Sequence, residues 1–142
     1  MNQVASAVTL PEPLAMYDIA LPTDGRLDTV RRCAQALADV GVNIDAINYT
    51  AMNGSPAFHL LVEDGPRVVR ILARGDVAEV TCRPVLVYTL PNRPGTLARY
   101  AGALVDDRVP IDFIYQATAK GVVVAAPDLE AVRASFAAAS AG

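Results

Sequence analysis

Tryptophan is absent from the sequence, histidine occurs once, and aromatic residues make up only 6% of the chain. The two cysteines, Cys33 and Cys82, stand alone, without a CxxC pair or metal-ligand spacing. The sequence also lacks a serine nucleophile elbow, a phosphate-binding loop and a metal signature. We therefore expect no catalytic residue, no metal and no cofactor, and we interpret both cysteines as small buried hydrophobes in a reducing compartment.

An excess of positive charge is also lacking, because twelve Lys and Arg residues stand against fifteen Asp and Glu residues. Proteins that bind nucleic acid usually carry a basic face, so nucleic acid is not an expected partner. No apolar run approaches the roughly 20 residues of a membrane span. Residues 1–13 lack the basic start of a secretory signal. These absences favour a cytoplasmic protein with no membrane partner.

Apolar residues, by contrast, are abundant, at 53% of the chain against 19% charged residues. Such a composition supports a packed core and argues against disorder. A length of 142 residues fits one ordinary domain or two very small ones.

An internal repeat favours two small units. Residues 40–51, VGVNIDAINYTA, align with residues 107–118, DRVPIDFIYQAT, so that Ile44 falls on Ile111, 67 positions further along. A repeat of this kind indicates that one supersecondary unit occurs twice.

Both halves predict the same order of strands and helices from their apolar spacing. In the first half we expect strands at 15–21, 44–51, 57–62 and 77–82, and helices at 28–39 and 66–73. In the second half we expect strands at 85–90, 111–118 and 122–126, and helices at 96–106 and 129–136. This β-α-β-β-α-β order is the ferredoxin-like pattern. We therefore predict an α+β fold with two ferredoxin-like units, at 14–82 and 83–142, each an antiparallel sheet with helices on one face.

The second half lacks a convincing last strand, because only AAASAG follows Phe136. The strand-like residues 4–10, VASAVTL, are a candidate to fill that edge, beside the strand at 85–90. The alternative is a loose N-terminal tail, since chain ends are usually loose unless they are tied into a sheet.

The turn NRPG at 92–95, directly before a predicted helix, is a candidate anion site. The first N–H groups of a helix have no intrahelical partner and carry the positive end of its dipole. Gly95 has no side chain, so a ligand carboxylate could reach the N–H groups of Gly95, Thr96 and Leu97. Arg93 could pair with the same carboxylate. The alternative is a Pro-Gly turn that only reverses the chain.

These segments together resemble a known family. NRPGTL before a helix, followed by VPIDFIYQAT, with GVNIDAINYT in the first half, resembles the ACT domain, and the resemblance covers about residues 14–136. The chain is similar to a small stand-alone tandem ACT protein. The resemblance implies units that bind amino acids or similar small molecules and regulate metabolic enzymes. It also implies a ligand held between two units.

In the resembling family, the ligand contacts the turn before the first helix of one unit and the start of the second strand of the other. The better-equipped site is then formed by Asn92, Arg93, Gly95, Thr96 and Leu97 with Asn43, Ile44 and Asp45. Pro110 stands where the first unit has Asn43 and offers neither an amide side chain nor a backbone N–H. The reciprocal site, formed by Thr23, Asp24, Gly25 and Arg26 with Pro110, Ile111 and Asp112, is therefore expected to be weaker. Asp45 and Asp112 are candidates to meet a ligand ammonium group; the alternative is a solvated carboxylate at a strand entrance, because charged residues are mostly exposed.

Assembly is also expected, because the strands at 44–51 and 111–118 carry apolar residues on both faces. A sheet with one solvated face alternates more cleanly, so something is expected to cover the second face, and we predict a homodimer.

Three functions remain open at this point. The first is a regulatory module that binds an amino acid and acts through a partner protein, for example an enzyme, or through its own assembly. The second is a small ferredoxin-like enzyme, of the isomerase, cyclase or monooxygenase type, with an acid–base site that uses Asp112 or Tyr115. The third is a structural subunit without a ligand. His59, inside AFHLLV, is interpreted as a core or sheet-face residue because no acid or nucleophile motif surrounds it.

Overall fold

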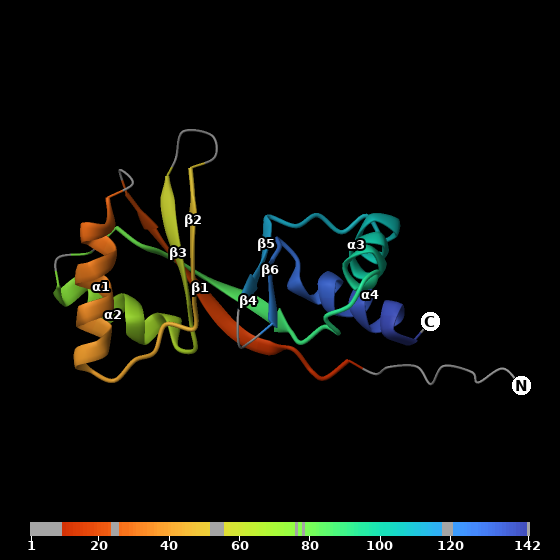
Figure 1. The fold of residues 1–142 in the computed structure, drawn as a ribbon, viewed down its shortest axis with the longest axis horizontal. Helices are drawn as coiled ribbons and strands as arrows, with labels where there is room; N and C mark the ends of the chain where they lie inside the picture. The colour runs from red at the N-terminus through yellow and green to blue at the C-terminus, as the bar shows by residue number, and fades with distance from the viewer. Residues whose placement is uncertain are drawn as a thin grey trace, which may run out of the picture. The chain divides into compact units, whose positions relative to one another are not determined.

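The computed structural model describes residues 10–23, 26–51, 56–75, 77, 79–117 and 121–141. Within these residues, six strands and four helices follow one another along the chain (Figure 1). They are β1 (Leu14–Pro22), α1 (Leu27–Asp39), β2 (Ala46–Thr50), β3 (Ala57–Val62), α2 (Gly65–Arg74), β4 (Thr81–Tyr88), α3 (Thr96–Asp106), β5 (Phe113–Ala117), β6 (Gly121–Ala125) and α4 (Leu129–Ala141).

The chain divides into two compact units. The first unit contains Ala15–Val85 and Ala117–Ala119, and the second contains Met1–Leu14, Leu86–Gln116 and Lys120–Gly142. Strand β4 belongs to both, because the division falls between Val85 and Leu86.

In the first unit, the strands follow the order β2-β3-β1-β4, which is the strand order of a ferredoxin-like sheet. Strands β1 and β2 are both antiparallel to β3. Alternate residues of β1 and β3 enter one core with side chains from α1 and α2, which pack against each other (Figure 1). The members of this core that come from the strands and helices include Ile19, Leu60, Cys33, Leu37 and Leu72. Both helices therefore cover the same face of the sheet.

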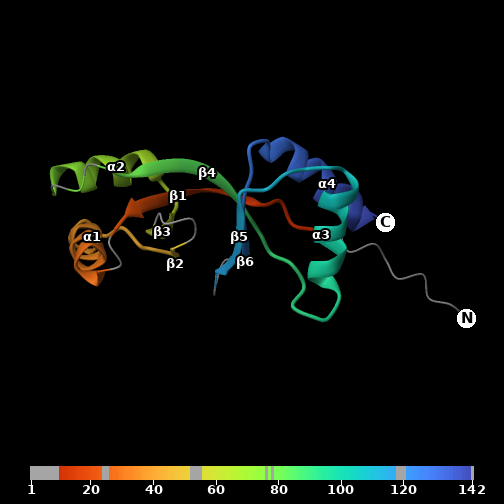
Figure 2. The same ribbon diagram turned by 90° about the horizontal axis from the view of Figure 1, so that it is seen from above.

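In the second unit, the strands follow the order β4-β6-β5. Helices α3 and α4 lie side by side in both views (Figure 1 and Figure 2). The rings of Tyr88 and Tyr100 pack on Phe136, with centroids 4.6 and 5.0 Å away. Gly121 has φ 111°, and a Cβ there would overlap the carbonyl oxygen of Tyr88. Only glycine therefore lets β6 approach β4 this closely.

The same backbone hydrogen bonds end the first helix of each unit. Val42 N–H donates to the Leu37 carbonyl at 2.9 Å, and Val109 N–H donates to the Leu104 carbonyl at 2.9 Å. The residue before each donor has positive φ, 72° at Gly41 and 54° at Arg108. Both helices thus end in the Schellman pattern. The recurring bonds have the 67-residue spacing of the sequence repeat.

The two largest differences from the sequence-based prediction concern β4 and α4. The strands expected at 77–82 and 85–90 form one strand, Thr81–Tyr88, because Pro84 is tolerated inside it at an exposed position. Helix α4 runs to Ala141, well past Phe136, since the alanines after Phe136 are strong helix formers.

The strands expected to begin at residues 44 and 111 begin at Ala46 and Phe113. The edge-strand hypothesis for residues 4–10 lies outside the described residues, apart from Leu10. None of the helices in the described residues is long and apolar enough to cross a membrane.

Candidate functional site

The NRPG turn leads directly into α3 and is held by short backbone bonds. Arg93 N–H donates to the Pro91 carbonyl at 3.1 Å, and Thr96 N–H donates to the Arg93 carbonyl at 3.3 Å. Gly95 occupies the N-cap position with φ 91°. A Cβ at Gly95 would meet nothing within 4 Å, so the glycine serves the backbone conformation and the space beside it is open.

The positive end of the α3 helix dipole has no negative side chain beside it among the described residues. Its first turn contains no acidic residue, and no side chain caps it. In the described part of the chain, the N–H groups of Leu97 and Ala98 have no hydrogen-bond partner. A helix start of this kind attracts an anion through both its N–H groups and its dipole.

A pocket of about 290 Å³ lies against the turn and α3. Two arginines line it, Arg93 and Arg99, and none of the described residues that line it is acidic. Its lining residues are Pro91, Arg93, Pro94, Gly95, Thr96, Arg99, Tyr100 and Ser140. The positive helix start and the two guanidinium groups therefore give one end of this pocket a chemistry that suits a carboxylate.

Helix α4 holds the far wall of this pocket in place. Arg99 Nε donates to the Ala139 carbonyl at 2.8 Å. The Tyr100 hydroxyl lies 3.0 Å from Ser140 Oγ, which donates to the Phe136 carbonyl at 2.8 Å. Because Ser140 uses its proton there, Tyr100 is the donor of the first bond.

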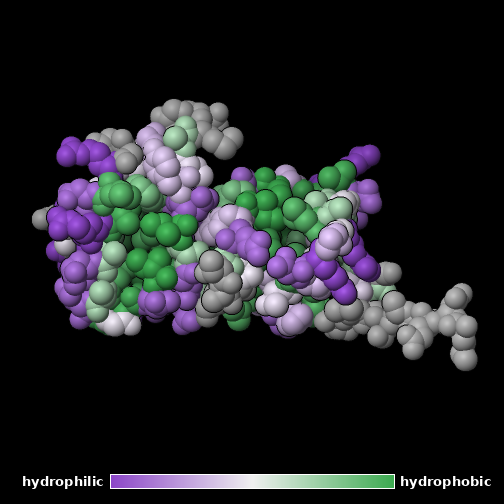
Figure 3. Space-filling model, viewed as in Figure 1, coloured by the Kyte–Doolittle hydropathy of each residue, from purple (hydrophilic) through white to green (hydrophobic). Residues whose placement is uncertain are grey.

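Of the five turn residues predicted from the sequence, three line this pocket, namely Arg93, Gly95 and Thr96. Asn92 is exposed beside the turn. The Leu97 side chain lines a separate apolar pocket of about 320 Å³, with Val105, Ile111 and Ile114. Figure 3 shows hydrophobic side chains gathered over this area of α3 and β5. Leu97 is 61% exposed and Val105 74% exposed.

The predicted strand residues of the stronger site belong to the first unit. Asn43 Nδ2 donates to Asp45 Oδ1 at 2.9 Å, just before β2. Asp45 N–H donates to the Leu61 carbonyl at 2.8 Å, and Ile44 packs against the first unit's core. The two polar side chains thus hold each other at the entrance of the strand. Their meeting with the turn of the second unit stays a prediction.

The weaker site is described only in part, because Asp24 and Gly25 lie outside the described residues. Thr23 Oγ1 donates to the Arg26 carbonyl at 3.4 Å. Asp112 N–H donates to the Ala125 carbonyl at 2.7 Å, which is the bond that Asp45 makes in the first unit. Ile111 is part of the apolar pocket beside α3.

Sequence reasoning missed Arg99, Tyr100 and Ser140. Arg99 and Tyr100 follow Thr96 by three and four positions and share its side of the helix, so helical spacing offered a signal for both. Ser140 offered none, because it lies beyond Phe136, where the predicted helix ended.

A buried acid also escaped the sequence analysis. Asp18 is 1% exposed, and its Oδ2 lies 2.7 Å from Nδ1 of His59 on the neighbouring strand β3. Its other oxygen, Oδ1, has no hydrogen-bond partner among the described residues. No cluster of three or more His, Cys, Asp or Glu side chains suited to a metal occurs in the described residues.

Comparisons with known proteins identify the fold. No protein-family profile and no curated relative matches the chain. Protein BT0572 from Bacteroides thetaiotaomicron has a similar structure, with a TM-score of 0.69 at 22% identity, over 88% of this chain and 87% of that one. The ligand-free regulatory subunit of aspartate kinase from Thermus thermophilus has a TM-score of 0.62 at 18% identity, over 93% and 96% of the two chains.

Aspartate kinase from Clostridium acetobutylicum also matches, with a TM-score of 0.64 at 14% identity, over 99% of this chain and 36% of the kinase. These likenesses show an α+β fold of the ACT-like, ferredoxin type. At such low identity they describe the fold, and function has to be argued from the site.

Proposed function

We propose that this protein is a tandem pair of ACT-like units that binds an amino acid, or a related small carboxylate, and regulates a partner protein. The observation that carries the proposal is the open, cationic start of α3, where Arg93 and Arg99 line one pocket with Gly95 and Thr96. A ligand carboxylate fits there because the helix start and the guanidinium groups all favour negative charge.

The other half of the proposed site is the first unit's strand entrance. Asp45 offers a carboxylate for the ligand's ammonium group, and Asn43 donates to that carboxylate at 2.9 Å. A ligand with both charges would satisfy both ends, whereas a simple anion would satisfy only the turn. The proposal therefore predicts an amino acid as the ligand and not an inorganic anion.

The repeated backbone bonds support the tandem interpretation. The helix ends at Val42 and Val109, and the strand entrances at Asp45 and Asp112, make matching bonds in the two units. Two copies of one unit would provide both the turn and the strand that such a site requires.

The structural neighbours support a regulatory role. Two of them are regulatory subunits of aspartate kinase, from Thermus thermophilus and Thermus flavus. By analogy, this chain would act on a separate catalytic partner. We also propose a homodimer, because the exposed residues Leu97, Val105, Ile111 and Ile114 form an apolar surface on the second unit.

A thermal-shift screen against the twenty amino acids tests this proposal, because a ligand that binds the native state raises its melting temperature by mass action. We expect a selective shift that Arg93→Ala abolishes. Arg31→Ala, at an exposed arginine of α1, is the matched control and should keep the shift. A shift of equal size in both variants would contradict the turn as the binding site. The absence of a shift with every amino acid would contradict the ligand class.

A further inference from the structure

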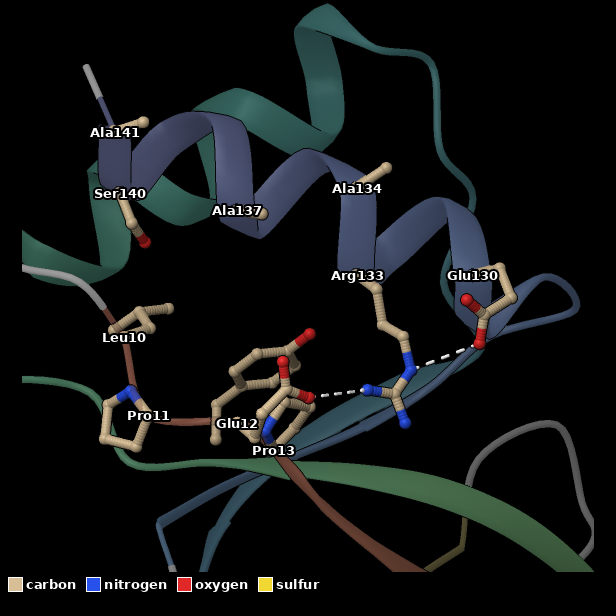
Figure 4. A pocket seen from close by; sticks show the side chains of 11 residues that line it. Leu10, Pro11, Glu12, Pro13, Glu130, Arg133, Ala134, Ala137, Ser140 and Ala141 are labelled. Atoms are coloured by element: carbon tan, nitrogen blue, oxygen red, sulfur yellow. Dashed lines mark hydrogen bonds and ion pairs between the residues drawn. The ribbon is translucent and has the colours of Figure 1, made fainter.

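A third and larger pocket, of about 560 Å³, lies in the second unit between residues 10–13 and α4. Figure 4 shows Ser140 pointing from α4 toward Leu10, and Arg133 pointing from the same helix toward Glu12. The pocket shares Ser140 with the turn pocket, but none of its other lining residues. None of the roles assigned so far uses it.

The pocket contains a buried hydroxyl without a partner. Tyr88 is 2% exposed and lines the pocket, and its hydroxyl has no hydrogen-bond partner among the described residues. A buried polar group without a partner is costly, and native structures seldom leave one unexplained. Burial raises the pKa of Tyr88 to about 12, so the hydroxyl stays protonated and can donate. A ligand oxygen that accepts this hydrogen bond would remove the cost.

The hydroxyl also lies within electrostatic range of the pocket's three charged side chains, Arg133, Glu12 and Glu130. Arg133 holds Glu12 at 3.3 Å and Glu130 at 3.1 Å (Figure 4). Both carboxylates are largely exposed, at 92% and 84%. Exposed ion pairs contribute little stability, so the guanidinium can exchange one of them for a ligand carboxylate.

The remaining walls are apolar and leave room for a hydrophobic body. Leu10, Pro11 and Pro13 form one side, and Ala134 and Ala137 of α4 form the other. The small alanine side chains account for the width of the groove along the helix. A pocket with apolar walls and a few convergent polar groups is the usual form of a small-molecule site.

We propose that this pocket binds a small carboxylic acid with an apolar body. Its carboxylate accepts hydrogen bonds from the Tyr88 hydroxyl and the Arg133 guanidinium, and its body lies against Leu10, Pro11 and Ala137. The pocket is a second binding site, and its argument does not depend on the site at the NRPG turn.

Calorimetric titration with phenylacetate tests this proposal, with phenylacetamide as the uncharged counterpart. We expect phenylacetate to bind and phenylacetamide to bind at least about tenfold more weakly, because the amide cannot pair with Arg133. No binding of phenylacetate, or equal binding of both compounds, would overturn the proposal.

Two matched substitutions on α4 locate the binding. Ala137→Leu fills the pocket from an exposed helix position, whereas Ala138→Leu adds the same volume at an exposed position outside the lining. The first should abolish phenylacetate binding, and the second should preserve it. Binding that survives Ala137→Leu would place the compound elsewhere and overturn the proposal.

Tyr88→Phe removes only the hydroxyl. We expect phenylacetate affinity to fall about tenfold while the melting temperature of the unliganded protein stays equal or rises, since the unpaired buried group is gone. Loss of phenylacetate binding in Arg93→Ala, with binding retained in Ala137→Leu, would place the compound at the turn site and overturn the proposal. Unchanged affinity in Tyr88→Phe would overturn the role of the hydroxyl.

Discussion

At the C-terminal ends of α1 and α3, two different residues adopt the same left-handed backbone conformation. Gly41 adopts it without a side chain, whereas Arg108 adopts it with φ 54° and a full side chain. Left-handed conformation costs an L-residue about 1–2 kcal/mol, and glycine largely escapes this cost. The first unit therefore has the relaxed version of a bend that the second unit makes under strain.

Replacing Arg108 with Gly should stabilise the protein. The relieved strain exceeds the added entropy of the unfolded chain, so we expect a gain of about 0.5–1 kcal/mol in the free energy of unfolding. Gly41→Ala is the mirror experiment and should lose about 1 kcal/mol, because a Cβ there meets open space and only the conformation is penalised. Urea denaturation of both variants measures these changes, and a loss in Arg108→Gly would contradict the argument.

Burial of Tyr88 makes the free energy of unfolding depend on pH in the alkaline range. Its pKa rises from 10.0 to about 12 on folding. Because the pKa is raised in the folded state, the contribution of Tyr88 to the free energy of unfolding is constant below pH 10. This contribution is lost as the pH rises from 10 to 12. Relative to Tyr88→Phe, the wild type should lose about 1–3 kcal/mol of unfolding free energy across that window. Parallel curves for the two proteins between pH 9 and 12 would contradict a buried phenol.

The Asp18–His59 pair is interpreted as a structural contact. His59→Ala would leave a buried carboxylate without its 2.7 Å partner, and we expect a loss of about 3 kcal/mol in unfolding free energy. Asn48→Ala, on the neighbouring strand opposite His59, is the control and should cost under about 1 kcal/mol. A small effect of His59→Ala would contradict the structural role of this pair.

At the scale of single elements, the close approach of β6 to β4 depends on one glycine, Gly121. Gly121→Ala should cost at least about 2 kcal/mol, because the new methyl group overlaps the Tyr88 carbonyl and φ is 111°. Gly102→Ala inside α3 is the control. A Cβ there meets nothing within 4 Å, so this variant should gain up to about 1 kcal/mol. Thermal denaturation of the two variants should therefore show shifts of opposite sign.

The order of the elements could be predicted from the sequence, because apolar spacing differs between helices and strands and recurs after 67 positions. The joining of two expected strands into β4 could not be predicted, since Pro84 usually marks a break and only the sheet shows that its position needs no N–H donor. The extension of α4 shows the converse error. The predicted helix ended at Phe136 and the alanines after it were considered only as a possible strand, although they are strong helix formers and Ser140 makes buried contacts.

The candidate site was predictable to the extent that it is local. The NRPG turn and the helix start follow each other in the chain. The helix dipole and the missing side chain of glycine were therefore enough to identify Arg93, Gly95 and Thr96 as candidates. Ser140 joins them only through the packing of α4 on α3, which no local pattern encodes. The same limit explains why the pocket around Tyr88 went unnoticed, since its walls come from both ends of the chain.

At the scale of the whole molecule, assembly is the main untested expectation. Val105 is 74% exposed within an apolar surface, so Val105→Asp should weaken a dimer by placing an unpaired charge in its interface. Ala73→Asp, at an exposed position of α2, adds the same charge elsewhere and should leave assembly unchanged. Sedimentation velocity distinguishes the two, and a wild-type protein that sediments as a monomer at every concentration would contradict the homodimer.

Strand β4 has a consequence for the way the protein unfolds. The chain passes from one unit to the other inside this strand, at Val85–Leu86, without a loop in which one unit could come apart alone. Residues Leu86–Tyr88 pair with β6, while the earlier part of the same strand belongs to the first unit's sheet. Loss of the whole of β4 therefore removes hydrogen bonds from both units, whereas fraying at one end removes them from one unit only, and we expect the amides at the centre of this strand to exchange most slowly.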